Sequence, residues 1–197
     1  MNSPKNTLPP RYFDDVYGAN EDPWQFTTSP YERDKYAVTV AALPRPIYES
    51  AFEIGCSIGV LTHLLATRCR RLLSVDVSEV ALRQARQRLA GSPQVRLENR
   101  VIPANFPDEQ FDLIIMSEVG YYWSLDDLKK TRRLMLDHLE PGGQLLLVHW
   151  TPVVPDYPLT GDQVHEAFLE ITGDKEPLRH LHGQREEKYR LDLFEKA

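Results

Sequence analysis

From residue 51 onward, short apolar runs alternate with longer segments whose apolar residues recur every three or four positions. Apolar runs bounded by turn residues predict buried strands, and the longer spacing predicts helices packed against them. The strands are expected at 51–54, 71–75, 95–97, 111–116 and 145–148. The helices between them are expected at 58–66, 78–89 and 126–139. The run 111–116 is almost continuously apolar, which is typical of a central strand covered on both faces.

The chain before residue 47 follows a different pattern. Its first ten or so residues carry prolines and polar side chains and are expected to fray. A segment rich in aromatic and acidic residues follows, which its prolines are expected to break into short pieces. Ser29 and Pro30 then have the pattern of an N-cap and a first helical residue, which predicts a helix that ends before Pro44. We expect residues 1–46 to form a helical cover and residues 47–197 an α/β core, together one domain.

The C-terminal part adds one helix and two strands. Residues 160–171 have helical spacing behind a candidate cap at Thr160, and residues 178–182 and 188–194 alternate with period two. These last two segments are expected to include an antiparallel edge. Alternating strands and helices predict a doubly wound, mostly parallel α/β sheet, because right-handed crossovers place helices on both faces. Such sheets bind ligands at the carboxyl ends of their strands, so candidate residues are sought there.

Composition and charge exclude some classes of protein. The 23 basic and 29 acidic residues give a formal charge of −6, which argues against a dedicated nucleic-acid binder. Two isolated cysteines, Cys56 and Cys69, have no metal-ligand spacing and fit a reducing, cytoplasmic compartment. The sequence also predicts no signal peptide, no membrane span and no membrane partner.

The end of the first predicted strand carries the clearest chemical signal. Glu53 is followed by a turn with Gly55 and Gly59, after which a helix begins. Gly55 permits a tight turn and close approach of a ligand to the backbone, and Gly59 lets the helix pack near the strand. Asp76 ends the next strand, where a carboxylate accepts hydrogen bonds from a ribose diol. The alternatives are an ordinary strand-to-helix turn and, for Asp76, a helix cap or a solvated acid.

The glycine spacing favours one class of cofactor. A dinucleotide fingerprint needs a second glycine where this chain has Ser57, and a third where it has Val60. Glu53 also places a carboxylate beside the turn, which repels pyrophosphate but suits a cationic ligand with an amino group. The pattern therefore favours a positively charged adenosyl compound over NAD. A nicotinamide-dependent reductase and a non-catalytic adenosyl-binding module remain as alternatives.

These residues carry a resemblance to a known superfamily. Glu53-x-Gly55-x-x-x-Gly59 with Asp76 is similar to the core motif of class I S-adenosylmethionine (SAM)-dependent methyltransferases, which often have glycine where Ser57 stands. Residues 22–24, 29–32 and 117–122 more narrowly resemble the NodS nodulation N-methyltransferases. The resemblance implies a Rossmann-like seven-stranded sheet in the order 3-2-1-4-5-7-6. It also implies methyl transfer from SAM, leaving S-adenosyl-L-homocysteine (SAH), to an amine such as a deacetylated amino sugar.

The resemblance also implies a set of cofactor residues. Glu53, Gly55 and Gly59 would line the methionine side, and Asp76 would hold the ribose. Adenine would contact backbone and apolar groups after the third strand, because residues 100–103 contain no acid. The complete expected cofactor set is Trp24, Tyr36, Glu53, Gly55, Cys56, Gly59, Asp76, Val77, Val101, Ile102 and Glu118. Trp24 and Tyr36 have plain packing of the N-terminal cover as their alternative.

The expected catalytic residues are Glu118 and His149. Glu118 follows the fourth predicted strand, where it would orient an ammonium group or accept its proton. Its alternative is a loop acid that caps the next helix. His149 ends the fifth strand and has either a base role or a structural one. His180 and His182 alternate on one predicted strand face and are expected to be structural.

The expected acceptor pocket is aromatic. Residues 121–123 are Tyr-Tyr-Trp and either pack in the core or form a pocket wall, the reading we favour because aromatic faces stabilise cations. The expected substrate residues are Tyr121, Tyr122, Trp150 and Tyr157. The sequence thus predicts in-line methyl transfer to a small-molecule or oligosaccharide acceptor, with positioning as the main source of rate gain.

Overall fold

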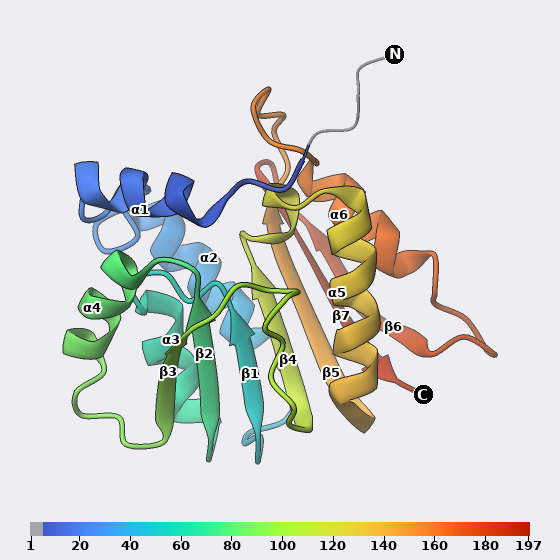
Figure 1. The fold of residues 1–197 in the computed structure, drawn as a ribbon. Coiled ribbons are helices and arrows are strands. Elements are labelled where there is room, and N and C mark those ends of the chain that lie inside the picture. Colours follow the sequence, from blue (N-terminus) through green and yellow to red (C-terminus); the bar gives the residue numbers. More distant parts are fainter. Residues whose placement is uncertain (1–5) are drawn as a thin grey trace. The chain divides into compact units, whose positions relative to one another are not determined.

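A computed structural model describes residues 6–197 of the chain (Figure 1). The chain divides into two compact units, residues 9–102 and residues 103–197 together with the N-terminal residues up to Leu8. Their strands form a seven-stranded sheet in the order β3-β2-β1-β4-β5-β7-β6. This is the predicted strand order, while the expectation of one domain with a separate cover over residues 1–46 stays a prediction.

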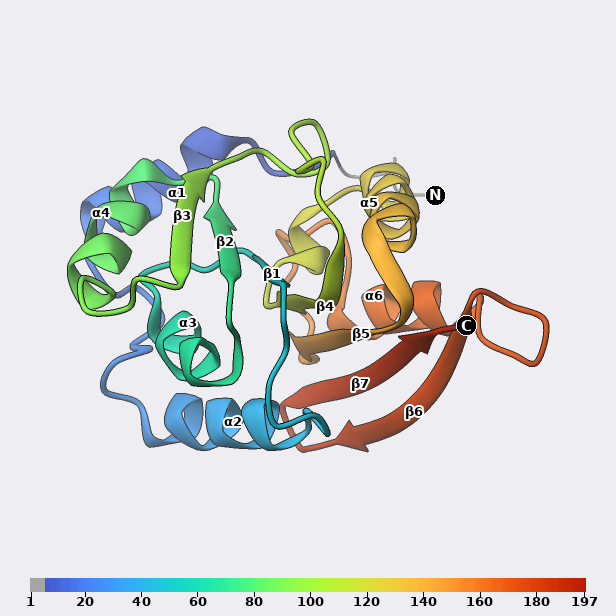
Figure 2. The same ribbon diagram turned by 90° about the horizontal axis from the view of Figure 1, so that it is seen from below.

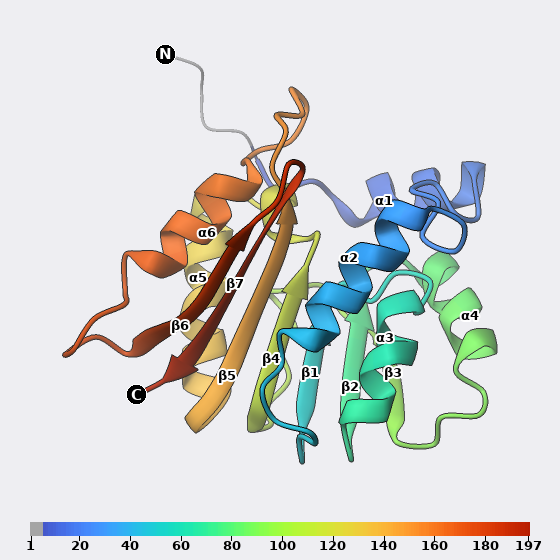
Figure 3. The same cartoon turned by 180° about the vertical axis from the view of Figure 1, so that it is seen from behind.

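The unit of residues 9–102 contains three parallel strands and their helices. The strands are β1 (Ala51–Ile54), β2 (Leu72–Asp76) and β3 (Val95–Asn99), with β2 paired to both neighbours. The helices are α1 (Pro10–Ala19), α2 (Pro30–Ala41), α3 (Val60–Leu65), the short 3-10 helix η1 (Ala66–Arg68) and α4 (Glu79–Arg88). Figure 3 shows α2 and α3 on one face of these strands. Every residue of β1 and β2 is buried, as their apolar runs predicted.

The predicted helix caps of this unit are confirmed. The side chain of Ser29 accepts a hydrogen bond from the backbone N–H of Glu32, and that of Ser78 accepts one from Ala81. Each bond satisfies one of the backbone donors that a helix start leaves unpaired.

The N-terminal segment holds a helix before the prolines that were expected to break it. This helix, α1, has ten residues, begins at Pro10 and ends before Pro23. A proline at the first helical position removes only a donor that would be unpaired there in any case. Tyr17 of α1 is buried against Ile58 and Ala81, with Phe13 and Trp24 packed beside it. The helix therefore gains its stability from packing rather than from local sequence.

The expectation of fraying is wrong for Thr7 and Leu8. The backbone N–H of Leu8 donates to the carbonyl oxygen of Tyr122 over 2.9 Å. The hydroxyl of Thr7 accepts from the backbone N–H of Ser124 over 2.8 Å. The part of that prediction that concerns residues 1–5 lies outside the described residues.

The second unit holds the other four strands. They are β4 (Phe111–Ser117), β5 (Leu139–Trp150), β6 (Leu178–Arg185) and β7 (Tyr189–Lys196). The helices are the 3-10 helix η2 (Gly120–Tyr122), α5 (Leu125–His138) and α6 (Gly161–Leu169). Strands β4 and β5 are parallel, whereas β7 is antiparallel to both β5 and β6, which confirms the predicted antiparallel edge. Figures 1 and 2 show α5 and α6 on the same face of these strands.

Strand β5 is longer than the predicted run 145–148. It begins at Leu139, which pairs with Phe111, and regular pairing resumes where Gln144 faces Leu113. Gly142 lies between these pairs with φ of +72°, a conformation that glycine adopts without strain. Residues 141–143, between the predicted helix and the predicted strand, are therefore an irregularity inside β5.

Among the described residues, none of the helices combines the length and the apolar character needed to cross a membrane.

Candidate functional site

The turn between β1 and α3 holds three residues in the left-handed backbone region. Gly55 and Gly59 both have φ of +79°, and Ser57 has φ of +53°. A Cβ atom added to Gly59 would lie 3.1 Å from the Cβ of Ala85 and 3.1 Å from the Cδ1 of Leu89. Gly59 thus permits close packing against α4 and the residue after it, whereas the sequence analysis assigned it to packing against the strand.

Ser57 adopts a conformation that is strained for a residue with a side chain, at a cost of about 1–3 kcal/mol. Two hydrogen bonds hold it there. Its backbone N–H donates to the Oδ2 atom of Asp76 over 2.8 Å, and its hydroxyl is hydrogen-bonded to the hydroxyl of Tyr17. The serine at this position is therefore tied to both β2 and α1.

Asp76 is buried at the carboxyl end of β2 and is held by backbone groups. Its Oδ1 atom accepts from the N–H of Ser78 over 2.9 Å, and its Oδ2 atom accepts from Ser57. Burial raises the pKa of Asp76 to about 6, although these backbone bonds act in the opposite direction. Its alternative role as a helix cap is wrong, because Ser78 caps α4.

Glu53 is a second buried carboxylate in the same unit, with 2% of its surface exposed. Its Oε2 atom accepts from the hydroxyls of Thr62 and Ser74, each over 2.7 Å. Burial raises the pKa of Glu53 to about 7, and the charge of Asp76 acts in the same direction. Both bonds go to the same oxygen of the carboxylate.

Sequence reasoning missed two residues that position Asp76. The side-chain amide of Asn99, at the end of β3, donates to the carbonyl oxygens of Asp76 and Val77 over 3.1 and 2.8 Å. Asp14 of α1 accepts from the hydroxyl of Ser78 over 2.6 Å. The sequence could have indicated Asn99, because it is a polar residue at the carboxyl end of a strand, which is the criterion that selected Glu53 and Asp76.

The remaining predicted cofactor residues of this unit divide by burial. Cys56 and Ile102 are buried, and burial raises the pKa of the Cys56 thiol. Val77 is half-buried and Val101 is 37% exposed.

Trp24 and Tyr36 join a chain of aromatic rings. Trp24 meets Tyr17 edge to face at 5.5 Å and stacks on Phe26 at 5.7 Å, and Phe26 lies 6.2 Å from the ring of Tyr36. Tyr36 is buried, with the ammonium group of Lys35 5.9 Å from its ring. These contacts support the packing alternative, and a cofactor role for the two residues stays a prediction.

Glu118, in the second unit, follows β4 with φ of +59°. Its Oε2 atom accepts from the hydroxyl of Tyr121 over 2.6 Å and from the backbone N–H of Trp150 over 2.9 Å. Its own backbone N–H donates to the carbonyl oxygen of Val148. The alternative role as a cap of the next helix is wrong, because Ser124 caps α5. Two donors therefore fix the carboxylate at the ends of β4 and β5.

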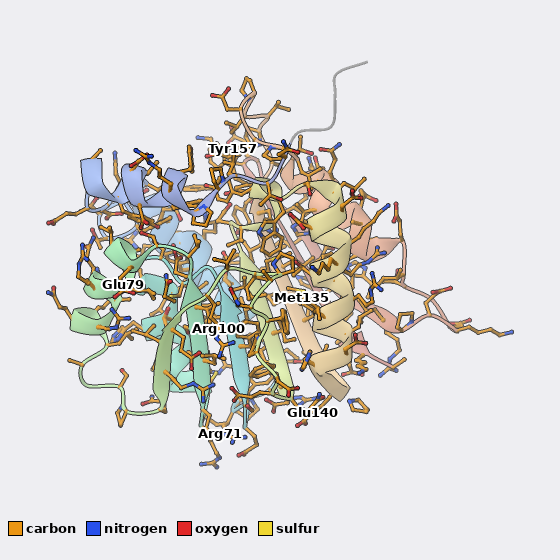
Figure 4. The ribbon with its side chains drawn as sticks, in the orientation of Figure 1. Arg71, Glu79, Arg100, Met135, Glu140 and Tyr157 are labelled. Carbon is orange, nitrogen blue, oxygen red and sulfur yellow. The ribbon has the colours of Figure 1, made fainter. Side chains whose placement is uncertain are left out.

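Three tyrosines form a cluster beside Glu118. The ring of Tyr121 stacks on that of Tyr157 at 5.2 Å, and Tyr122 meets both rings edge to face at 4.7 Å. Tyr121 and Tyr122 are buried, and Tyr157 is half-buried on the loop between β5 and α6, where Figure 4 labels it. Burial raises the pKa of Tyr121 well above its usual value. Trp123 is buried and Trp150 is half-buried.

The structure argues against His149 as a catalytic base. The side chain has no exposed surface, and its Nε2 atom accepts from the backbone N–H of Gly120 over 3.1 Å. Its Nδ1 atom lies 3.1 Å from the Nε2 atom of His165. Both ring nitrogens are thus engaged inside the protein, which supports the structural alternative.

The two histidines of β6 differ in environment. The Nε2 atom of His180 lies 2.7 Å from the Oδ1 atom of Asp192, whereas His182 is exposed. A register irregularity between them breaks the regular alternation that the sequence predicted. His180 thus has the structural partner expected of it. Within residues 6–197, no group of three or more His, Cys, Asp and Glu side chains is arranged to hold a metal ion.

Comparison with solved structures defines the class of protein. NodS from Bradyrhizobium japonicum WM9, an N-methyltransferase solved with SAH, is 26% identical, with a TM-score of 0.81 over 95% of this chain and 98% of that chain. A putative methyltransferase from Pseudomonas syringae is 39% identical, with a TM-score of 0.73 over 84% of this chain and 99% of that one. The fold is therefore the Rossmann-like methyltransferase fold.

Sequence comparison gives the family. The family model described as Nodulation protein S (NodS) matches residues 16–149, and the chain belongs to this family. Nodulation protein S of Rhizobium tropici is 33% identical over 132 residues, which cover 65% of this chain and 55% of that protein. The match thus spans little more than half the length of this curated relative. These findings give no support to the alternative of a nicotinamide-dependent reductase.

Proposed function

We propose that this chain is a SAM-dependent methyltransferase that methylates an amine. Membership of the NodS family supports the methyl-transfer chemistry, since a related member was solved with SAH. The single observation that carries the proposal is the paired burial of Glu53 and Asp76 around a turn that holds three left-handed residues.

The β1–α3 turn fits a cationic adenosyl cofactor. Glu53 has one carboxylate oxygen engaged by Thr62 and Ser74, and its second oxygen would accept from the ammonium group of SAM. Asp76 would accept from the ribose hydroxyls with the lone pairs that Ser57 and Ser78 leave unused. A cationic ligand also offsets the unfavourable burial of two neighbouring carboxylates, which pyrophosphate would worsen.

The remaining cofactor roles follow from position. Gly55, Cys56 and Gly59 form the turn, and their backbone would lie along the methionine part of the cofactor. Val77, Val101 and Ile102 follow β2 and β3 and would contact the adenosine part through backbone and apolar groups. Trp24 and Tyr36 would cover the site. When bound, SAM supplies an activated methyl group on a sulfonium centre, so the protein mainly needs to align a deprotonated acceptor.

Glu118 is the proposed base, and it would also contact the cofactor's sulfonium side. Hydrogen bonds from Tyr121 and Trp150 fix the direction of its carboxylate. A carboxylate so held would bind an acceptor ammonium group and take a proton from its nitrogen at an Oε atom. Tyr121, Tyr122, Trp150 and Tyr157 would form the pocket wall, because aromatic faces stabilise a cation by about 0.5–2 kcal/mol.

The finer proposal is an amino-sugar acceptor, a small molecule or an oligosaccharide with a free amine. It is supported by the family alone. The test is transfer of a labelled methyl group onto partly deacetylated chitin oligomers, beside unrelated amines and phenols. Methylation of the oligomers alone supports the amino-sugar proposal, and methylation of other amines alone refutes it while keeping the amine chemistry.

A binding experiment separates the cofactor classes. Calorimetric titration is expected to show binding of SAM and SAH and none of NADPH. SAM binding without methyl transfer to any acceptor in a broad panel would instead identify a non-catalytic adenosyl-binding module. Preferential binding of NADPH would overturn the proposal.

A further inference from the structure

A chain of buried hydrogen bonds runs from the turn after β4 to the centre of β7. The backbone N–H of Gly120 donates to the Nε2 atom of His149 over 3.1 Å. His149 then meets His165 of α6 over 3.1 Å, and the Nδ1 atom of His165 meets the Oδ2 atom of Asp192 over 2.6 Å. His149, His165 and Asp192 are each at most 1% exposed. None of these three side chains has a part in the proposed chemistry.

The direction of every bond in this chain follows from its first donor. Because the Nε2 atom of His149 accepts from Gly120, its proton resides on Nδ1 and is donated to His165. The Nε2 atom of His165 is then an acceptor, so its Nδ1 carries the proton that is donated to Asp192. Both imidazoles are neutral and share one tautomer, with the negative charge of Asp192 at the end.

The turn at the other end of this chain carries the proposed base. Glu118 is held in a left-handed conformation two residues before Gly120. A Cβ atom added to Gly120 would lie 2.6 Å from the Cγ1 atom of Val164 and 3.1 Å from the Nε2 atom of His149, so the turn packs directly on α6 and β5. An unpaired backbone donor at this buried position would destabilise the turn.

We propose that His149, His165 and Asp192 form a hydrogen-bond relay that fixes the turn of residues 118–122, and that they are positioning residues for methyl transfer. The inference rests on the proposed role of Glu118. Asp192 sets the tautomer of His165, which sets that of His149, which supplies the acceptor for Gly120. The relay holds the turn in place without touching the acceptor.

The surroundings of the relay keep it in this state. Burial lowers the pKa of His165, although the hydrogen bond that His165 donates to Asp192 acts against this effect. Burial also opposes the charge of Asp192, but hydrogen bonds from His165 and His180 and the charge of Arg190 outweigh it and hold its pKa below the usual value. Tyr121 meets the ring of His149 edge to face, and the charges of Asp162, Arg190 and Asp192 act on His165. Three further titratable groups contact these residues in turn: Glu118 contacts Tyr121, Glu166 contacts Arg190 and His180 contacts Asp192.

One added proton disrupts this arrangement. If the Nε2 atom of His149 binds the proton, its new N–H group points at the backbone N–H of Gly120 and can no longer accept from it. If the Nε2 atom of His165 takes it, either the two imidazoles present donors to each other or His149 changes tautomer and again faces Gly120 with a donor. The relay therefore makes the turn of residues 118–122 sensitive to acid.

The test combines histidine tautomers, amide exchange and turnover in the full chain. Nitrogen-15 spectra of the wild-type histidines are expected to show His149 and His165 protonated on Nδ1. The Gly120 amide is expected to exchange at least tenfold faster in His149→Leu than in the wild type, with at least a tenfold fall in kcat/KM for the acceptor. The affinity for SAH is expected to change by no more than about threefold.

A conservative variant and a matched control complete the design. His149→Gln retains an amide oxygen that accepts from Gly120 and does not titrate, so it is expected to restore slow exchange and to weaken the acidic limb of the pH profile. His182→Leu removes an exposed histidine of β6 and is expected to match the wild type. Wild-type His149 protonated on Nε2, or equal Gly120 exchange in His149→Leu and wild type, would overturn the relay.

The relay and the proposed function fail in different ways. Glu118→Gln is expected to abolish methyl transfer while the Gly120 amide stays protected. In a second outcome, the protein methylates no acceptor while the exchange rate of the Gly120 amide still changes in the His149 variants as expected. That outcome would count against the proposed function and would support the relay. If His149→Leu does not fold, the tautomers of the wild type and the exchange rate in His149→Gln decide the question.

Discussion

At the residue scale, Glu53 and Ser57 each adopt a state that their own chemistry disfavours. Glu53 is a carboxylate with a pKa raised to about 7 by burial, and Ser57 has a backbone conformation suited to glycine. Such states persist only where surrounding contacts enforce them, and they concentrate at functional sites. Both lie in the one turn that the sequence motif singled out.

The first prediction concerns the charge of Glu53. A cationic ligand favours the charged form, so SAM is expected to bind more tightly as the pH rises through about 7, with release of a proton. Calorimetry in buffers of different ionisation enthalpy measures that release. Glu53→Gln is expected to weaken SAM binding at least tenfold and to flatten this pH dependence near 7. Equal proton release in the variant and the wild type would remove Glu53 from the site.

The second prediction concerns the hydrogen bond between Tyr17 and Ser57. Tyr17→Phe removes one partner of this bond and is expected to lower the free energy of unfolding by about 0.5–1.5 kcal/mol. Ser57→Gly removes the other partner but relieves the left-handed strain, so its effect is expected to be smaller. Urea unfolding of both variants and the double variant measures the coupling. Strictly additive effects would show that the bond contributes nothing.

At the scale of elements, close packing of α3 and α4 depends on a residue without a side chain. The Cβ of an alanine at position 59 would lie 3.1 Å from Ala85 and Leu89, and the backbone there has φ of +79°. An added side chain would therefore push against both Ala85 and Leu89. Under the proposed function, Gly59 would link helix packing to cofactor binding.

The third prediction tests this link. Gly59→Ala is expected to destabilise the protein by about 1–3 kcal/mol through overpacking and backbone strain, and to weaken SAH binding. Gly91→Ala is the matched control, because an added Cβ there meets nothing within 4 Å. Thermal unfolding and SAH titration provide the readouts. Equal behaviour of the two variants would contradict the packing argument.

The fourth prediction concerns Asp76, whose side chain connects the end of β2 to the β1–α3 turn. Asp76→Ala leaves the backbone donors of Ser57 and Ser78 without their acceptor, so it is expected to weaken SAM binding at least tenfold. Asp76→Asn keeps one acceptor oxygen and is expected to lose less. Unchanged SAM affinity in Asp76→Ala would exclude Asp76 from the site.

At the scale of the whole molecule, buried acids give the stability an unusual pH dependence. Folding raises the pKa of Glu53 from 4.5 to about 7 and that of Asp76 from 3.8 to about 6. At a pH between the unfolded and the folded pKa of either group, the folded state therefore binds more protons than the unfolded state. Their contribution to stability is therefore present at low pH and is lost as the pH rises toward 7. Asp192 has a lowered pKa and acts in the opposite sense, losing its contribution as the pH falls.

The fifth prediction follows from this sign. At pH 8, Glu53→Gln is expected to be more stable than the wild type, by up to about 3 kcal/mol at 1.36 kcal/mol per pKa unit. The difference is expected to shrink as the pH falls and to be smallest below about pH 4, where the wild-type carboxyl is protonated in both states. Urea unfolding at the two pH values measures it. A variant that is less stable than the wild type at pH 8 would contradict the inference.

The sequence by itself determined most of the strands and helices, the caps and the glycine turn after β1, because these depend on neighbouring residues. The apolar run of β4, the caps Ser29, Ser78 and Thr160, and the glycines of the turn all act within a few positions along the chain. Local periodicity and backbone preference are readable wherever the interacting residues are close in sequence.

Only the tertiary structure decided how the polar side chains are used. Ser57, Asp192 and Glu118 each have a hydrogen-bond partner far along the chain, at 40, 27 and 32 positions, and no local pattern indicates these three partners. Packing of distant elements places both ring nitrogens of His149 in hydrogen bonds to Gly120 and His165. The residue that the sequence offered as a candidate base therefore has a structural role beside the turn. The direction of these long-range hydrogen bonds and the burial of these polar side chains arise from contacts made on folding, so they cannot be read from the order of residues.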